Sequence, residues 1–288
     1  MAQEREIATR IRSLGELAEI VTAIRAIAAS QMQQALRSSE AIGRYSGLIR
    51  TALSDAASLL PADETIAPTA GKSGQVLFGA EHGLCGGFNQ QLLRAIQRHS
   101  QEKAEKPLLI VVGSRAARLC RERGLQPDVA VPMATHYAGV TGTAHRVAAD
   151  LFRMLSERQV AGVELVYATH GGQVLKVQRQ KLLPLDLPSE KPRSSQFPPI
   201  INVRPRQLLD GMISEYLFAV LENAAMQSFF SENFARFRTM EAAHQNIRKK
   251  SAELTTLAQR MRQEAVTSEI LELISGAEAL SSVRNASN

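Results

Sequence analysis

The sequence predicts an α/β fold in which long N- and C-terminal helices form an antiparallel coiled coil around an inserted α/β domain. Apolar residues recur at helical spacing along both ends, and short apolar runs alternate with helical stretches in the middle. All eleven prolines lie between Pro61 and Pro205, so both ends lack the residue that most disrupts helices. Four segments are expected: a helix over 1–60, an α/β domain over 61–183, a proline-rich linker over 184–205 and a helix over 206–288.

The N-terminal segment carries one apolar stripe, spaced by three or four residues as on one face of a helix: Ile7, Ile11, Leu14, Leu17, Val21, Ile24, Ala28, Met32 and Ala35. Between Glu4 and Ser58 the only glycines are Gly15, Gly43 and Gly47. About 50 residues can therefore form one helix, roughly 80 Å long at about 1.5 Å per residue.

The C-terminal segment carries a heptad seam whose steps alternate between four and three: Met240, His244, Ile247, Ser251, Leu254, Ala258, Met261 and Ala265. A second apolar stripe precedes it: Leu209, Met212, Ile213, Tyr216, Leu217, Val220, Leu221 and Ala224. Because several seam residues are small or polar, the two helices are expected to bury little apolar surface between them. The expected partner is the N-terminal helix, antiparallel because the chain leaves and returns through the middle domain.

The middle segment predicts a parallel sheet, because its apolar runs alternate with helical stretches. The strands are expected at 76–78, 108–112 and 129–131, and the helices at about 89–103, 114–123 and 143–158. Two further strands, at 163–168 and 174–180, flank a predicted hairpin turn at 170–173. The result is a Rossmann-like three-layer domain of about 110 residues.

Composition excludes several classes of protein. Two cysteines, Cys85 and Cys120, are too few for a disulfide framework, which favours a reducing compartment. No apolar run approaches the roughly 18 to 20 residues that span a bilayer, and no apolar signal-peptide core is evident near the start. The expectation is a protein that is soluble or peripheral to a membrane.

The net charge of +6 comes from the middle of the chain. Residues 1–60 hold seven Arg and six acids, residues 206–288 nine bases and ten acids, and residues 61–205 eighteen bases and twelve acids. No aromatic residues interleave with the basic cluster at 115–123, as nucleic-acid platforms require. This favours a solvated helix face and leaves an alternative: a coiled-coil adaptor whose basic domain binds nucleic acid or an anionic membrane.

The glycine loop, Gly83-Leu84-Cys85-Gly86-Gly87, admits three interpretations. It has the spacing of a nucleophile elbow with Cys85 as the thiol, but the preceding strand ends too early for a tight elbow. It precedes a helix and could cradle a phosphate, but it matches neither common phosphate motif. The third interpretation is a tight loop with a small buried thiol. The six histidines are scattered, so no metal site, cofactor or small-molecule ligand is expected.

Three segments resemble one known family. Residues 20–32, IVTAIRAIAASQM, are similar to I-T-K-A-M-x-M-V-A-A-S-K-M; residues 82–89, HGLCGGFN, to R-G-L-C-G-G-L-N; and residues 260–270, RMRQEAVTSEI, to R-x-R-Q-A-x-I-T-x-E-I. In this order and architecture, the chain resembles the gamma subunit of F-type ATP synthases over essentially its whole length. The substitutions Thr22, Gln31 and His82, where the family has Lys, Lys and Arg, suggest a divergent bacterial branch.

The resemblance implies a non-catalytic rotor shaft. Its partners would be the alpha and beta subunits of the catalytic ring, an epsilon subunit and the membrane ring of c subunits, with no nucleic acid. It would be peripheral, on the cytoplasmic face of the bacterial plasma membrane. By carry-over, a beta-subunit contact is expected at Arg262, Gln263, Thr267 and Glu269, a shaft contact at Arg25 and Gln31, and a close approach to a beta subunit at Gly83, Cys85, Gly86 and Gly87.

Overall fold

The computed structural model describes residues 2–57, 71–102, 106–157, 160–171, 174–185 and 201–286. By contacts the chain divides into two units, one of Met1–Arg25 with Met240–Asn288 and one of Ala26–Thr239. The long helices α1 (Ala2–Ala57) and α5 (Pro205–Ala286) each contribute to both. The boundaries between these two units fall inside α1 and α5, and not at the prolines that divide the sequence, because the middle of α5 packs on the α/β domain. No helix of the described residues is long and apolar enough to cross a bilayer.

The Ala26–Thr239 unit contains one five-stranded sheet with the order β3-β2-β1-β4-β5. Strands β1 to β4 are parallel, and β5 runs antiparallel to β4. The strands are β1 (Lys72–Phe78), β2 (Leu108–Val112), β3 (Val129–Val131), β4 (Val160–Gly171) and β5 (Val174–Leu183). The remaining elements are α2 (Phe88–Glu102), α3 (Ser114–Glu122), the 3-10 turn η1 (Tyr137–Gly139) and α4 (Val140–Ser156).

This arrangement confirms the predicted α/β class and the predicted parallel sheet. The predicted strands at 108–112 and 129–131 match β2 and β3 residue for residue, and the others are extended by a few residues. The β4–β5 pairing, in which Gly171 is opposite Val174, is that of the expected hairpin. Residues 172–173 of its turn and residues 186–200 of the predicted linker lie outside the described residues.

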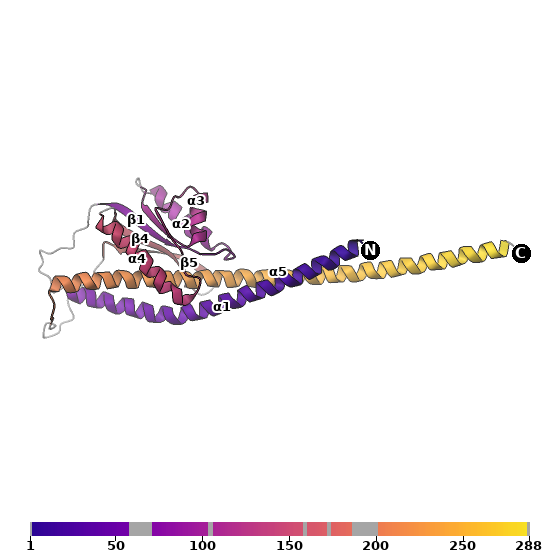
Figure 1. Cartoon of the computed structure of the whole chain (residues 1–288), viewed down its shortest axis with the longest axis horizontal. Helices are drawn as coiled ribbons and strands as arrows, with labels where there is room; N and C mark the ends of the chain where they lie inside the picture. The colour runs from indigo at the N-terminus through magenta and orange to yellow at the C-terminus, as the bar shows by residue number, and fades with distance from the viewer. Residues whose placement is uncertain are drawn as a thin grey trace. The chain divides into compact units, whose positions relative to one another are not determined.

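Alternate side chains of the sheet enter two separate cores, as a pleated strand requires. Leu77 of β1 packs with α2 and α3 on one face, and Val76 and Phe78 pack with α4 on the other. Figure 1 shows α2 and α3 on one side of the sheet and α4 on the other. Because both faces are covered, the parallel strands β2 and β3 are continuous apolar runs, whereas the antiparallel edge strand β5 alternates apolar and polar residues.

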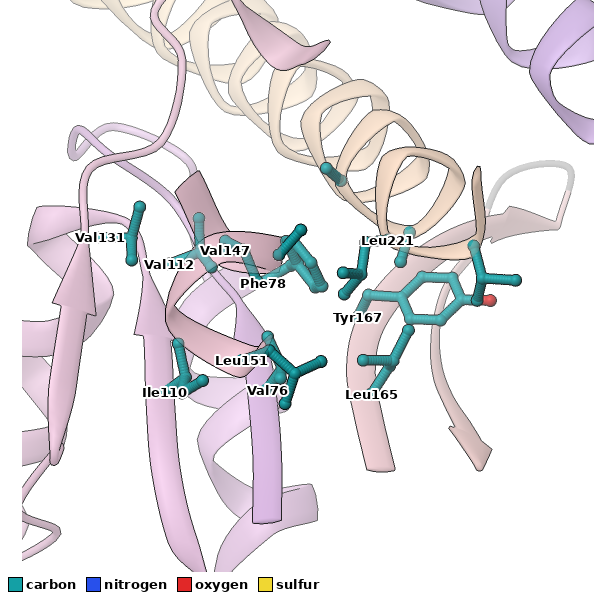
Figure 2. Packing of buried hydrophobic residues seen from close by; sticks show 14 of the residues in the cluster. Val76, Phe78, Ile110, Val112, Val131, Val147, Leu151, Leu165, Tyr167 and Leu221 are labelled. Atoms are coloured by element: carbon teal, nitrogen blue, oxygen red, sulfur yellow. The ribbon is translucent and has the colours of Figure 1, made fainter. Parts of the chain in front are cut away.

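The middle of α5 belongs to the core of the sheet, which the sequence did not predict. Leu217, Leu221 and Phe229 are almost fully buried in the cluster that contains Phe78. In Figure 2, Leu221 lies on α5 above Tyr167 of β4. The apolar stripe from Leu209 to Ala224 was expected to pack on the N-terminal helix. It also packs on the sheet, where α5 and α4 together form the third layer of the domain.

Within this unit α1 runs antiparallel to α5, as predicted. The Gln227 amide donates to Ser39 Oγ at 2.6 Å, and the Tyr45 hydroxyl donates to a Glu215 carboxylate oxygen at 2.5 Å. Farther along α1, Leu53 and Ala56 form a small core with Leu209 of α5. Partner numbers fall along α5 as they rise along α1, which fixes the direction of pairing.

The other unit is the helix pair formed by the start of α1 and the end of α5. Arg25 Nη1 lies 2.5 Å from Glu241 Oε2, and the seven seam positions from Met240 to Met261 are all buried or half-buried. Two predictions are wrong: Leu17 is 49% exposed, and Ala265 is exposed. A straight α-helix has 3.6 residues per turn, so at this turn the residue on the face toward α5 is Ala18 and not Leu17.

Candidate functional site

A ligand of a parallel α/β sheet normally binds outside the carboxyl ends of the strands, where the strand order reverses. In this sheet the reversal lies between β1 and β4, and α5 occupies the crevice. Ser228 Oγ donates to the carbonyl oxygen of Phe78 at 2.7 Å, and Ser231 Oγ donates to that of Ala168 at 3.1 Å. Both serines are fully buried. The crevice is thus filled by the chain itself.

The glycine loop connects β1 to α2 at this edge. Asn89, at the start of α2, accepts a hydrogen bond from the backbone N–H of Ala80 at 3.0 Å. Two loop residues have positive φ, Leu84 at 62° and Gly86 at 55°. A Cβ on Gly86 would lie 2.8 Å from Thr239 Oγ1 of α5, whereas Gly83 and Gly87 have free space. Of the three, Gly86 is the glycine that the backbone and the packing both require.

Cys85 has the environment of an inert thiol. It is 4% exposed, and burial, with a contribution from the Glu232 charge, raises the pKa of its thiol to about 11. A thiol that stays protonated at neutral pH is a poor nucleophile, which argues against the hydrolase interpretation. A cavity of about 350 Å³ lies beside it, between the loop and Phe234, Arg238 and Thr239 of α5.

A buried carboxyl group underlies the loop. Glu232 of α5 is 3% exposed and pairs with Arg236 one turn later. Burial raises the pKa of Glu232 to about 7, although the Arg236 charge and the nearby backbone amide of Glu81 oppose the change. Its second oxygen, Oε2, has no hydrogen-bond partner. Neither Glu232 nor Glu81 was singled out from the sequence.

Arg25 and Gln31 make contacts inside the chain. Arg25 pairs with Glu241, and hydrogen bonding to Arg25 is the main cause that lowers the pKa of that carboxyl. Gln31 Oε1 accepts the backbone N–H of Tyr137 at 2.9 Å, which joins α1 to η1. Both residues therefore hold α1 to other elements of the chain.

The four residues expected at a beta-subunit contact lie together near the end of α5. Arg262, Gln263, Thr267 and Glu269 are all exposed. Gln259, Arg262, Gln263, Val266 and Thr267 line one open face of the helix, as spacings of three and four residues dictate. The hydroxyl of Thr267 donates to the carbonyl of Gln263 at 2.8 Å. The side chains that remain available are those of Arg262, Gln263 and Glu269.

No group of three or more His, Cys, Asp or Glu residues with metal-binding geometry occurs among the residues that the structure describes. The basic cluster lies on α3 and at Arg123, the residue that follows it, with Arg118, Arg121 and Arg123 exposed and Arg115 half-buried. This is the solvated helix face that the sequence favoured.

Comparison with known proteins gives one consistent result. A family model described as ATP synthase matches residues 3–280. The chain is 28% identical over 286 residues to the ATP synthase gamma chain of Moorella thermoacetica, covering 97% of this chain and 100% of that protein. It is also 28% identical to the gamma chain of Anaeromyxobacter dehalogenans over 295 residues, with 97% and 100% coverage.

Solved structures agree in fold. The rotor of the Euglena gracilis mitochondrial ATP synthase gives a TM-score of 0.64 at 16% identity, covering 92% of this chain and 99% of that one. A second structure, of the Euglena OSCP/F1/c-ring assembly, gives a TM-score of 0.65 at 15% identity, with 97% and 95% coverage. None of these similarities supports an adaptor for nucleic acid or membranes.

Proposed function

Because the chain belongs to the ATP synthase gamma-chain family, we propose that it is the central rotor shaft of an F-type ATP synthase. The shaft couples ion-driven rotation of the membrane ring to conformational change in the catalytic beta subunits. This coupling requires a stiff, asymmetric helical element, and it does not require this chain to catalyse a chemical reaction. The ligand crevice of the sheet, filled by Ser228 and Ser231, fits a non-catalytic subunit.

One observation carries the proposal: the end of α5 is a single helix that exposes a dense set of large apolar side chains. From Arg262 to Ser275 every residue is exposed. Five of these residues are large and apolar and are between 49% and 69% exposed: Val266, Ile270, Leu271, Leu273 and Ile274. Apolar groups gathered in this way mark a surface that another protein covers. A ring of alpha and beta subunits that encloses the helix would cover all its sides.

The polar side chains beside this apolar stretch provide the contact with a beta subunit. Arg262 offers five N–H donors and Gln263 both donors and an acceptor, which suits carboxylates and carbonyls on a surface that slides past. Glu269 follows Arg262 by seven residues, about two turns, and lies near the same side of the helix. The glycine loop, with Leu84 58% exposed at its tip, is the second proposed contact with a beta subunit.

The remaining partners follow from the same assignment. An epsilon subunit and the ring of c subunits would bind the Ala26–Thr239 unit, and the complex would sit at the cytoplasmic face of a bacterial plasma membrane. The bacterial gamma chains of similar length support this location.

Reconstitution with alpha and beta subunits tests the proposal. The full chain should co-purify with both subunits, and removing the residues after Met261 should lower rotation-coupled ATP hydrolysis severalfold. The double variant Arg262→Ala with Gln263→Ala should show a smaller loss. Glu264→Ala provides the control, because Glu264 is equally exposed but lies outside the face lined by Arg262 and Gln263. A chain that fails to join an alpha–beta ring would refute the proposal.

A further inference from the structure

Glu81 lies where three loops meet at the carboxyl edge of the sheet. It follows Phe78, the last residue of β1, by three residues and precedes Gly83 by two. One of its carboxylate oxygens, Oε2, accepts the backbone N–H of Ser114 at 2.9 Å and that of Met133 at 2.8 Å. The other, Oε1, accepts the Ser114 hydroxyl at 2.6 Å. One side chain thus joins the segments that follow β1, β2 and β3.

The position that this carboxylate occupies is the N-terminus of α3. The free N–H groups and the dipole of a helix favour a negative charge there, and phosphate ligands of related sheets use this kind of place. Burial alone would raise the pKa of Glu81, but the hydrogen bonds from Ser114 and Met133 outweigh it and lower the pKa. The carboxylate is therefore bound in its ionised form, as an anion supplied by the chain.

We infer that Glu81 is a positioning residue, which holds the start of the glycine loop on α3 and so fixes the loop against α5. The backbone just before Glu81 supports this role, since the N–H of Ala80 donates to Asn89 Oδ1 of α2 at 3.0 Å. Two residues before Glu81, the N–H of Gly79 donates to the carbonyl oxygen of Val112 at 2.8 Å. The section from Gly79 to Glu81 is thus held from both sides, while Gly83 and Gly87 have open space around them.

The consequence for the shaft rests on the proposed function, in which the glycine loop meets a beta subunit. Holding one end of the loop with hydrogen bonds to a charged carboxylate keeps Leu84 at a constant place as the partner surface passes. The positioning of the loop is nevertheless a property of the chain alone, and it can be measured without the other subunits.

The two cysteines report on the loop and on the domain separately. Cys85 lies in the glycine loop and Cys120 in α3, and both are buried and free. A thiol reagent added to the full native chain reaches Cys85 when the loop opens and Cys120 when the domain unfolds. The ratio of the two labelling rates therefore isolates loop opening from a general loss of stability.

Glu81→Ala should raise the labelling rate of Cys85 by about tenfold and leave that of Cys120 within about twofold. Glu81→Gln should give an intermediate rate, because one amide oxygen replaces two charged ones. Ser114→Ala, which removes the hydroxyl and keeps the charge and the backbone N–H, should give a small increase and covers the case in which Glu81→Ala does not fold. The control is Glu122→Ala, which removes an exposed carboxylate from α3 itself.

Equal acceleration of Cys85 and Cys120, or an unchanged Cys85, would show that Glu81 does not position the loop. Neither result would bear on assembly with alpha and beta subunits, so the shaft proposal stands or falls on its own experiment. If the chain assembles and Cys85 opens selectively, Glu81→Ala in the reconstituted ring measures how much the fixed loop contributes to coupling.

Discussion

Ser228 of α5 donates its hydroxyl to the carbonyl oxygen of Phe78, the last residue of β1, at 2.7 Å in the interior of the protein. The contact joins residues 150 positions apart. It satisfies a strand end that would otherwise face an empty crevice, and it makes the long helix an integral part of the sheet domain. The long helix and the sheet are therefore joined by buried hydrogen bonds as well as by apolar packing.

Ser228→Ala should lower the free energy of unfolding by about 1–2 kcal/mol, because it leaves a buried carbonyl without a partner. Urea unfolding of the full chain, followed by circular dichroism, measures the change. Ser214→Ala is the matched control on the same helix, since its hydroxyl bonds only to Asp210 of the preceding turn and is exposed. The control should change stability by less than about 0.5 kcal/mol. Equal losses would mean that the contact with β1 adds nothing.

Gly86→Ala and Gly87→Ala form a second matched pair. Gly86 has a φ of +55° and faces Thr239, while a Cβ added to Gly87 would meet no atom closer than 3.9 Å and the φ of Gly87 is not positive. Gly86→Ala should cost about 1–2 kcal/mol, the strain of a left-handed conformation. Gly87→Ala should be close to neutral. If both variants were neutral, the loop would not need Gly86 for its own folding, and the reason for that glycine would lie in contacts with a partner.

Local patterns predicted the elements of this fold well, because each depends on nearby residues. The runs at 108–112 and 129–131 are strands at the predicted bounds, since a buried parallel strand is a short apolar run between helical stretches. The heptad seam from Met240 to Met261 is likewise confirmed by burial. The prediction at Leu17 was wrong because, counted from Leu14, a step of three residues leads to Leu17 and a step of four leads to Ala18, and both steps fit one face of a helix.

Contacts between distant segments could not be predicted in the same way. The pattern of α5 shows that Leu217 and Leu221 are buried, but it does not say whether α1 or the sheet covers them. Nothing in the sequence indicated that Ser228 and Ser231 contact the sheet, because a serine within a helix does not by itself indicate burial or a hydrogen-bond partner. Glu81 had a weak one: a carboxylate just after the first strand of a parallel sheet lies near the N-termini of the helices at that edge.

Arg25→Glu should weaken the pairing of α1 with α5 in the Met1–Arg25 and Met240–Asn288 unit, because it places two carboxylates opposite each other. Glu241→Arg should do the same, and the double variant with both exchanges should recover most of the loss. Thermal unfolding of the full chain measures all four proteins. Because the pair is partly exposed, the recovery should shrink in high salt. Independent, additive losses would show that Arg25 and Glu241 do not interact.

Glu232 should make the stability of the protein depend on pH in the direction opposite to that of most carboxylates. Burial raises its pKa to about 7 in the folded chain from an ordinary value of 4.5. Between these values the folded state binds the proton and the unfolded state does not. The free energy of unfolding should therefore fall as the pH rises from about 4.5 to about 7 and then level off, by at most on the order of 3 kcal/mol.

Urea unfolding of the wild type and of Glu232→Gln across this range isolates the effect. His170 acts the other way, because burial lowers its pKa and the unfolded state gains its proton first as the pH falls. The difference between the two proteins removes that contribution. Relative to wild type, Glu232→Gln should become more stable as the pH rises from about 5 to about 7, because the amide never ionises. Glu253→Gln, at an exposed position of α5, should show no such trend. A constant difference between Glu232→Gln and wild type would mean that Arg236 keeps Glu232 ionised throughout, and that its pKa is not raised.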